Sequence, residues 1–264
     1  MDIVAIIILL IAGFLFGIIS SIAGIGGGVF FVSFMVLIFI IPINIAIDTS
    51  IFIILISSGA GFFTYFKEER LHIKQVIIFS SFSILGSITS TLIFTPLNLD
   101  STILKIIFAT AILLSGLNMI YKAIKSRKLN PDIKEYENNF SLHSHDYKKN
   151  LKKSIPLFFL AGFFANLLGI GGGIINTPAL HIILQYPIHN ATAISTGMIF
   201  VTAIYNTIVK SILGQINYLI GILIGVGGIL GSIVGAKISG KMPKSYLKFF
   251  VAMILIFLAI RMYF

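Results

Sequence analysis

Apolar stretches of about 17 to 23 residues recur along nearly the whole chain, and they constrain its fold more than any other feature. Each of the longer ones can cross roughly 30 Å of hydrocarbon. Because the backbone finds no water in a bilayer core, spanning segments form either helices or closed barrels. Only 11% of the residues are charged, compared with about 25% in a soluble domain. We therefore predict an all-α polytopic membrane protein whose membrane region forms one body.

The net charge of the chain is +10, and its basic residues stand in a few short connections. Such charges orient a membrane protein and contact anionic headgroups, so we expect membrane lipid as a partner and no nucleic acid. The chain has no cysteine, which excludes disulfides, thiolate metal sites and cysteine nucleophiles. Residues 1–23 lack the basic start of a signal peptide, and we interpret them as a retained helix.

An internal repeat with a constant offset of 145 positions divides the chain into two halves. The stretch "GIISSIAGIGGGVFF" at 17–31 aligns with "GFFANLLGIGGGIIN" at 162–176. The same offset then pairs Pro42 with Pro187 without a gap. One register held over so many residues indicates that both halves share one structural plan.

Each half is predicted to contain about five helical segments, some of them short or re-entrant, with breaks at glycine and proline. The segments cover 3–23, 29–43, 46–66, 73–95 and 101–122 in the first half, and 154–168, 174–186, 191–212, 217–238 and 245–263 in the second. The predicted domains are a first transmembrane repeat (1–122), a basic cytoplasmic linker (123–153) and a second transmembrane repeat (154–264).

The distribution of basic residues predicts the topology. Lys67 and Arg70 follow the third segment and Lys241 follows the ninth, whereas the connection at 95–102 has no Lys or Arg. The basic connections, including the linker, thus follow odd-numbered segments and face the cytoplasm. Equivalent connections of the two halves then face opposite sides, so we predict inverted repeats in the inner cell membrane with both termini outside.

The motif "GIGGG" occurs once in each half, at 24–28 and 169–173, and interrupts apolar helical sequence. Interrupted helices at equivalent positions of inverted repeats are typical of the binding site of a secondary transporter. Free backbone N–H groups at a helix beginning attract anions. We therefore expect these glycines to bind a small anionic substrate: Gly24, Gly26, Gly27, Gly28, Gly169, Gly171, Gly172 and Gly173. The alternative is a packing role, because the spacing also fits the small-xxx-small pattern.

Hydroxyl and amide side chains near the two motifs are further candidates for contact with the oxygens of an anion. They are Ser20, Ser21, Thr49, Ser50, Asn166, Asn176, Thr177, Ser195 and Thr196. Ser50 and Ser195 are favoured because they are equivalent in the repeat. The alternative is that the hydroxyls cap helices or bond to the backbone of the preceding turn.

Asp48 is the candidate coupling residue, since it is the one acidic residue between Asp2 and Glu68. An intramembrane carboxylate can carry a coupling proton, or it can cap a helix that begins beside it. Lys210 can attract an anion or extend its ammonium group toward the membrane interface.

The sequence contains no H-E-x-x-H, no G-x-S-x-G and no paired carboxylates within its apolar segments. Such groups would be needed by an intramembrane enzyme, so we expect a protein without catalytic activity. We also expect no cofactor and no metal ion. Nucleotide-binding motifs are absent, which leaves an ion gradient or the substrate's own gradient as the energy source.

The duplicated "GIGGG", with "IDTS" and "AISTG" downstream and a basic linker between the halves, resembles the TauE/SafE family, also called sulfite exporters. The resemblance covers residues 10–122 and 154–263 and implies seven to nine spanning segments. It also implies a small sulfur-containing anion, such as sulfite, a sulfonate or sulfoacetate, as substrate. Pro178 has no counterpart in the first half, where "VFFV" follows the motif.

Together these features predict a secondary transporter of a small, sulfur-containing anion that works by alternating access between inverted repeats. The alternatives are an anion channel and a membrane scaffold without transport activity. The sequence leaves open whether the chain forms a homo-oligomer.

Overall fold

The structure is a computed structural model that describes residues 2–97, 100–126, 145, 147–213, 215–239 and 244–263. Every regular element among these residues is helical. Seven of the described helices are long and apolar enough to cross a membrane. The predicted all-α polytopic membrane fold is therefore confirmed.

The helices repeat with the offset found in the sequence. They are α1 (Ile3–Ala23), α2 (Gly28–Leu37), α3 (Ile43–Lys67), α4 (Ile73–Leu97), α5 (Ser101–Ser126), α7 (Lys148–Leu168), α8 (Gly173–Pro178), the π-helical turn η1 (Ala179–Ile183), α9 (Ile188–Leu213), α10 (Tyr218–Ser239) and α11 (Lys244–Tyr263). The first four helices each begin 145 positions before α7, α8, α9 and α10. The repeat therefore sets where the helices begin as well as the residue pattern.

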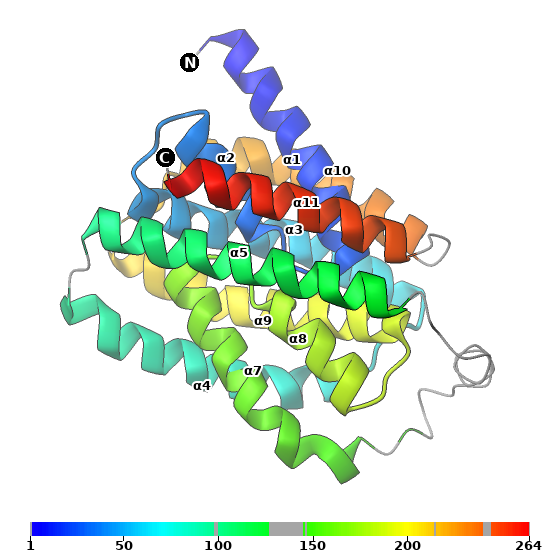
Figure 1. Cartoon of the computed structure of the whole chain (residues 1–264). Coiled ribbons are helices and arrows are strands. Elements are labelled where there is room, and N and C mark those ends of the chain that lie inside the picture. The colour runs from blue at the N-terminus through cyan, green and yellow to red at the C-terminus, as the bar shows by residue number, and fades with distance from the viewer. Residues whose placement is uncertain are drawn as a thin grey trace.

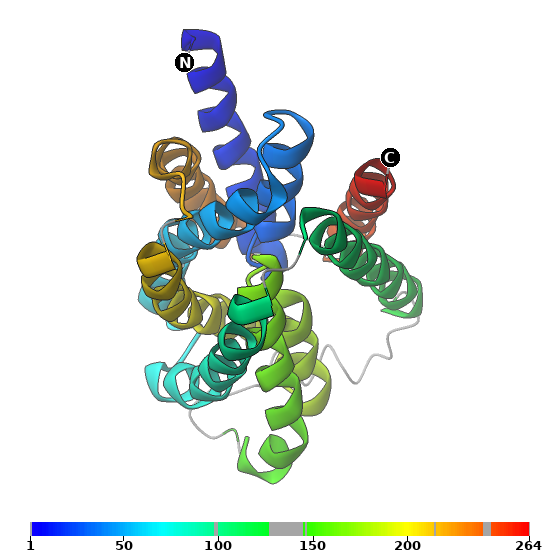
Figure 2. The same cartoon turned by 90° about the vertical axis from the view of Figure 1, so that its left-hand side faces the viewer.

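Equivalent helices exchange partners between the halves. Helix α1 packs along α10, and α7, the equivalent of α1, packs along α4. Helices α3 and α9 contact each other and are the most buried of the long described helices. Helices α5 and α11 run in opposite directions and form a pair at one side of the bundle (Figures 1 and 2). Reciprocal contacts of this kind are expected about a pseudo-two-fold axis, while the orientation of the halves in a membrane stays a prediction.

Glycines allow the exchanged pairs to approach closely. A Cβ atom added at Gly227 or Gly231 of α10 would overlap a backbone carbonyl oxygen of α1. In the other pair, a Cβ at Gly86 of α4 would overlap the backbone of α7, and one at Gly162 of α7 would overlap α4. These contacts between helix backbones replace the hydrophobic driving force that is missing between helices in lipid.

Two predicted segments differ most from the structure, each by six residues at one end. The segment predicted at 29–43 stops at Leu37, because the chain leaves the helix before Pro42, which precedes α3. The segment predicted at 154–168 is wrong in length, since α7 begins at Lys148. The first turn and a half of α7 is mostly polar. The predicted segment began only where the apolar sequence begins. Most of the predicted linker, like the breaks at Gly214 and Pro243, lies outside the described residues.

The absence of a first-half equivalent of Pro178 has a structural consequence. Helix α2 continues to Leu37, whereas α8 ends at Pro178 and continues as the π-helical turn η1. Proline has no N–H to donate to the preceding turn, and such a loss commonly changes the hydrogen-bond spacing. The two halves thus differ directly after their motifs.

Candidate functional site

The two GIGGG motifs form tight loops, each joining a long helix to a short one. Gly24 and Gly169 end α1 and α7 in the left-handed conformation, each with φ of 64°. Gly27 and Gly172 precede α2 and α8 with φ of 71° and 76°. Glycine adopts this conformation without the steric penalty of other residues. Each motif can therefore end one helix and begin the next within five residues.

Hydroxyl groups from the opposite half hold both loops. Ser50 Oγ lies 3.0 Å from the carbonyl oxygen of Gly169 and shares its one hydrogen with Ile47 O, in its own helix, at 2.7 Å. Ser195 Oγ donates to the carbonyl oxygen of Gly24 at 3.1 Å. These two bonds are equivalent in the repeat. Thr177 Oγ1 also donates to Gly24 O, at 2.8 Å. In this conformation, three of the predicted anion-binding hydroxyls thus bond to the carbonyl oxygens of the motifs themselves.

The motifs contact each other at the interface between the halves. A Cβ atom added at Gly26 would lie 3.2 Å from the Cα atom of Gly171, and the reverse distance is also 3.2 Å. At Gly28 and Gly173 an added Cβ would overlap a carbonyl oxygen of the opposite motif. The glycines therefore permit close packing here, and their contact with a substrate stays a prediction.

A polar cavity of about 420 Å³ lies between the halves. Its walls come from α3, α4 and α5 of the first half and from α7 and α9 of the second. The polar lining consists of Asn44, Asp48, Ser90, Thr91, Thr95, Asn166, Lys210 and Gln215. This volume is large enough for a small ion with several waters.

Asp48 and Lys210 form an ion pair in the polar cavity. Lys210 Nζ lies 2.7 Å from Asp48 Oδ1, with 18% of the lysine side chain and 4% of the aspartate side chain exposed. Asp48 stands in the second turn of α3, which begins at Ile43, so the helix-cap alternative is wrong. The ammonium group of Lys210 pairs with Asp48, and its position relative to the membrane interface stays a prediction.

Several polar atoms of the cavity lining are buried without a partner. Asn166 Nδ2 donates to Ser87 O at 3.2 Å and to Thr91 Oγ1 at 2.9 Å, which leaves Asn166 Oδ1 unbonded. Ser90 Oγ and Asn44 Oδ1 are unbonded as well. Buried polar atoms in proteins are nearly always hydrogen-bonded. The polar cavity is therefore suited to water and to a polar solute.

The chain's membership of a family follows from comparison with known proteins. The sequence model described as "Sulfite exporter TauE/SafE" matches residues 9–262. This chain belongs to the TauE/SafE family. The predicted resemblance is thus confirmed.

Two curated relatives carry the same general name, "Probable membrane transporter protein". The chain is 27% identical to "Probable membrane transporter protein YunE" of Bacillus subtilis over 81% of either chain. It is 32% identical to "Probable membrane transporter protein MJ0441" of Methanocaldococcus jannaschii, over 75% of this chain and 69% of the relative. No solved structure matches the chain. The comparisons support a multi-pass membrane transporter.

Among the residues predicted to bind substrate in this TauE/SafE protein, only Asn166 lines the polar cavity, together with the candidate coupling residue Asp48. The others are buried in the interface, where several serve the protein's own backbone. The backbone carbonyl oxygens of Ser20 and Ser21 accept hydrogen bonds from Gly24 N and Tyr65 Oη. The hydroxyl of Thr49 accepts a hydrogen bond from Asn217 N, and that of Thr196 donates to Thr192 O. Asn176 Oδ1 has no hydrogen-bond partner.

Sequence reasoning missed most of the polar lining. None of the residues Asn44, Ser90, Thr91, Thr95 and Gln215 is repeated as the same residue at its equivalent position, and none belongs to a recognisable motif. Lys210 was recognised as a residue that can attract an anion, but its pairing with Asp48 was missed, although a lysine and a carboxylate within apolar helices are expected to pair.

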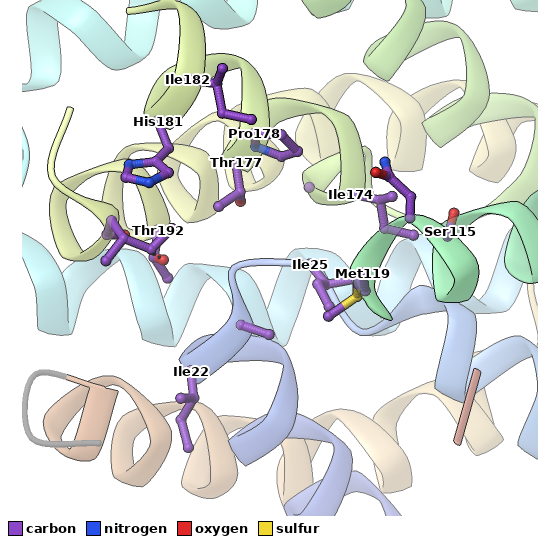
Figure 3. Close-up of a pocket in the computed structure, with 14 residues that line it drawn as sticks. Ile22, Ile25, Ser115, Met119, Ile174, Thr177, Pro178, His181, Ile182 and Thr192 are labelled. Carbon is purple, nitrogen blue, oxygen red and sulfur yellow. Dashed lines mark hydrogen bonds between the residues drawn. The ribbon is translucent and has the colours of Figure 1, made fainter. Parts of the chain in front are cut away.

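A second pocket, of about 80 Å³, lies beside Gly173 of the second motif, and Figure 3 shows residues that line it. Ile22, Ile25 and Met119 line it together with Thr177 and His181. Its surface is mainly apolar, and the residues that line it include no Lys and no Arg. An anion would lose its hydration there without compensation, so the polar cavity is the better candidate site.

Proposed function

We propose that this protein is a secondary transporter of a small, sulfur-containing anion of the sulfite or sulfonate class. The observation that carries this proposal is the buried Lys210–Asp48 pair in a polar cavity between the halves. In this mechanism the anion enters the cavity, binds Lys210, and is released on the other side after the inverted repeats have moved against each other. The family's description as a sulfite exporter supports the choice of substrate class.

A difference between equivalent positions supports alternating access. The equivalents of Asp48 and Lys210 in the repeat are Ala193 and Tyr65, and both are fully buried. Tyr65 Oη donates to the carbonyl oxygen of Ser21 at 2.8 Å. One side of the interface is therefore hollow and polar, while the equivalent region is packed. A transporter with two equivalent halves is expected to alternate between such states.

Asp48 is the proposed coupling group of the transporter. Among the residues that line the polar cavity, Lys210 is the one cation and Asp48 is the one carboxylate. An anion that binds Lys210 competes with the Asp48 carboxylate, and protonation of Asp48 removes this competitor. Proton and anion would then move together.

Flux measurements in proteoliposomes test the proposed function. Wild-type protein is expected to give saturable sulfite uptake that a pH gradient accelerates. Asp48→Asn is expected to keep sulfite exchange and to lose accumulation driven by the pH gradient. An ohmic anion current without saturation would overturn the carrier and favour a channel, and no flux of any tested anion would favour a scaffold.

The proposed inverted topology makes a prediction for single cysteines in this cysteine-free chain. Asp100→Cys, in the connection before α5, is expected to react with an impermeant maleimide on intact cells. Glu68→Cys, directly after α3, is expected to react only after the cells are opened, because its connection is basic. Labelling of both positions from the same side would contradict the topology.

A further inference from the structure

A small void of about 10 Å³ lies at the interface between the halves, close to the second GIGGG motif. Its lining includes Gly171 of that motif, Ala165, and the polar side chains Thr202 and Asn206 of α9. A void of this size holds about one water molecule at most. It is therefore too small for an anion in this conformation.

On each of three helices, residues that line the void are close in sequence to residues that line the polar cavity. On α3 the cavity is lined by Ile47 and the void by Ile51, one turn further along. On α9, Lys210 lines the cavity and Asn206, one turn away on the same face, lines the void. On α7 the two spaces are lined by neighbouring residues. The void thus continues the cavity toward the contact between the motifs.

Asn206 has an unused polar atom in this place. The residue is only 2% exposed, and its Oδ1 has no hydrogen-bond partner. Thr202 Oγ1, one turn away, already donates to the carbonyl oxygen of Met198 at 2.8 Å. A buried amide oxygen without a hydrogen-bond partner is uncommon and calls for a partner that the protein does not supply.

The polar track on α9 has no equivalent in the first half. Thr202, Asn206 and Lys210 are spaced four residues apart, and the corresponding positions on α3 are Ser57, Gly61 and Tyr65. At Gly61 an added Cβ would lie 3.0 Å from Ser21 Oγ, so a longer side chain there would require Ser21 to move. An amide at this depth is therefore particular to the half that carries Lys210.

We propose that Asn206 is a specificity-determining contact for the oxyanion after it has left Lys210 on its way through the interface. The proposal rests on the proposed function, because it assigns a second step to the same transport path. The void must widen for an anion to reach Asn206, and movement of the two halves away from each other provides that room.

The chemistry of the two side chains separates their roles. The Lys210 ammonium is a point charge that attracts any small anion with little regard to shape. The Asn206 amide has two N–H donors in fixed directions, and a half-turn of its terminal bond presents them to the void. A buried amide rejects a ligand that cannot accept directed hydrogen bonds, because its own groups then stay unpaired. Asn206 should thus favour an oxyanion over a halide.

Sulfite uptake and its inhibition by chloride in proteoliposomes test this role. Asn206→Leu, which keeps the branched shape and the number of side-chain heavy atoms and removes the amide, is expected to raise the KM for sulfite about tenfold. The inhibition constant of chloride is expected to stay within about twofold, so the preference for sulfite over chloride falls about tenfold. Asn118→Leu on α5, which lines the apolar pocket, is the matched control and should change neither constant.

Asn206→Ser, which needs no additional room, covers the case in which the leucine variant does not fold. Its single hydroxyl donor is expected to give a smaller rise in KM, about threefold. A folded variant with wild-type KM and wild-type preference for sulfite would overturn the inference and leave Asn206 as the ligand of a buried water. If wild-type protein transports no sulfite and binds none, the proposed function fails instead, and with it the substrate on which the inference rests.

Discussion

Replacing Lys210 by methionine is expected to lower the kcat/KM for anion transport about a hundredfold. Methionine keeps the apolar length of the side chain but removes the one positive charge among the residues that line the polar cavity. The Asp48 carboxylate then stands alone in the cavity and repels the substrate. A hundredfold loss in kcat/KM corresponds to about 3 kcal/mol of activation free energy. The loss of folding stability on breaking a buried ion pair is typically of the same size or somewhat larger. Initial rates of sulfite uptake into proteoliposomes measure the loss in kcat/KM.

The Lys210→Met variant should also be less stable, by about 3 to 5 kcal/mol, because it leaves a buried carboxylate without its partner. Adding Asp48→Asn makes the cavity neutral and is expected to restore the thermal unfolding temperature but not transport. Lys74→Met, at an exposed position of α4, is the control and should leave both properties unchanged. A double variant that transports like wild type would mean that the ion pair serves only the fold.

Helix positions could be predicted from the sequence because their signals are local. Glycine and proline break helices wherever they occur, so the motifs and Pro42 placed the beginnings of α2 and α3 within a few residues. The constant offset then carried each boundary from one half to the other. The exception is α7, whose polar first turns carry no apolar pattern and whose beginning was therefore missed.

The site was harder to predict because its contacts join distant parts of the chain. Asp48 was recognised from its rarity, but its partner Lys210 lies on the other central helix, and no local pattern connects them. Asn206 was not considered, since an asparagine within a helix has many ordinary explanations. The hydroxyls of Ser50 and Ser195 were recognised as equivalent, yet the sequence could not tell that they bond to the motifs' carbonyl oxygens.

Introducing alanine at both Gly28 and Gly173 is expected to destabilise the protein by at least roughly 3 kcal/mol. Both residues have ordinary helical backbone angles, so alanine adds no conformational strain and space alone decides. At each position the new methyl group would overlap a carbonyl oxygen of the opposite motif, and a backbone atom cannot rotate away as a side chain can. The two motifs must then separate. Thermal unfolding in detergent should show a fall of about 6 to 12 °C.

Gly228→Ala in α10 is the matched control for this double variant. Its nearest contact would be Ser57 Cβ at 3.1 Å, which a small shift relieves, so we expect a change of less than about 1 kcal/mol. The comparison separates the two explanations of the duplicated GIGGG motif. If the double variant keeps its unfolding temperature and loses only sulfite affinity, the glycines line the substrate site. If stability falls as expected, their first role is to bring the two halves into contact, and the anion is bound by the side chains beside them.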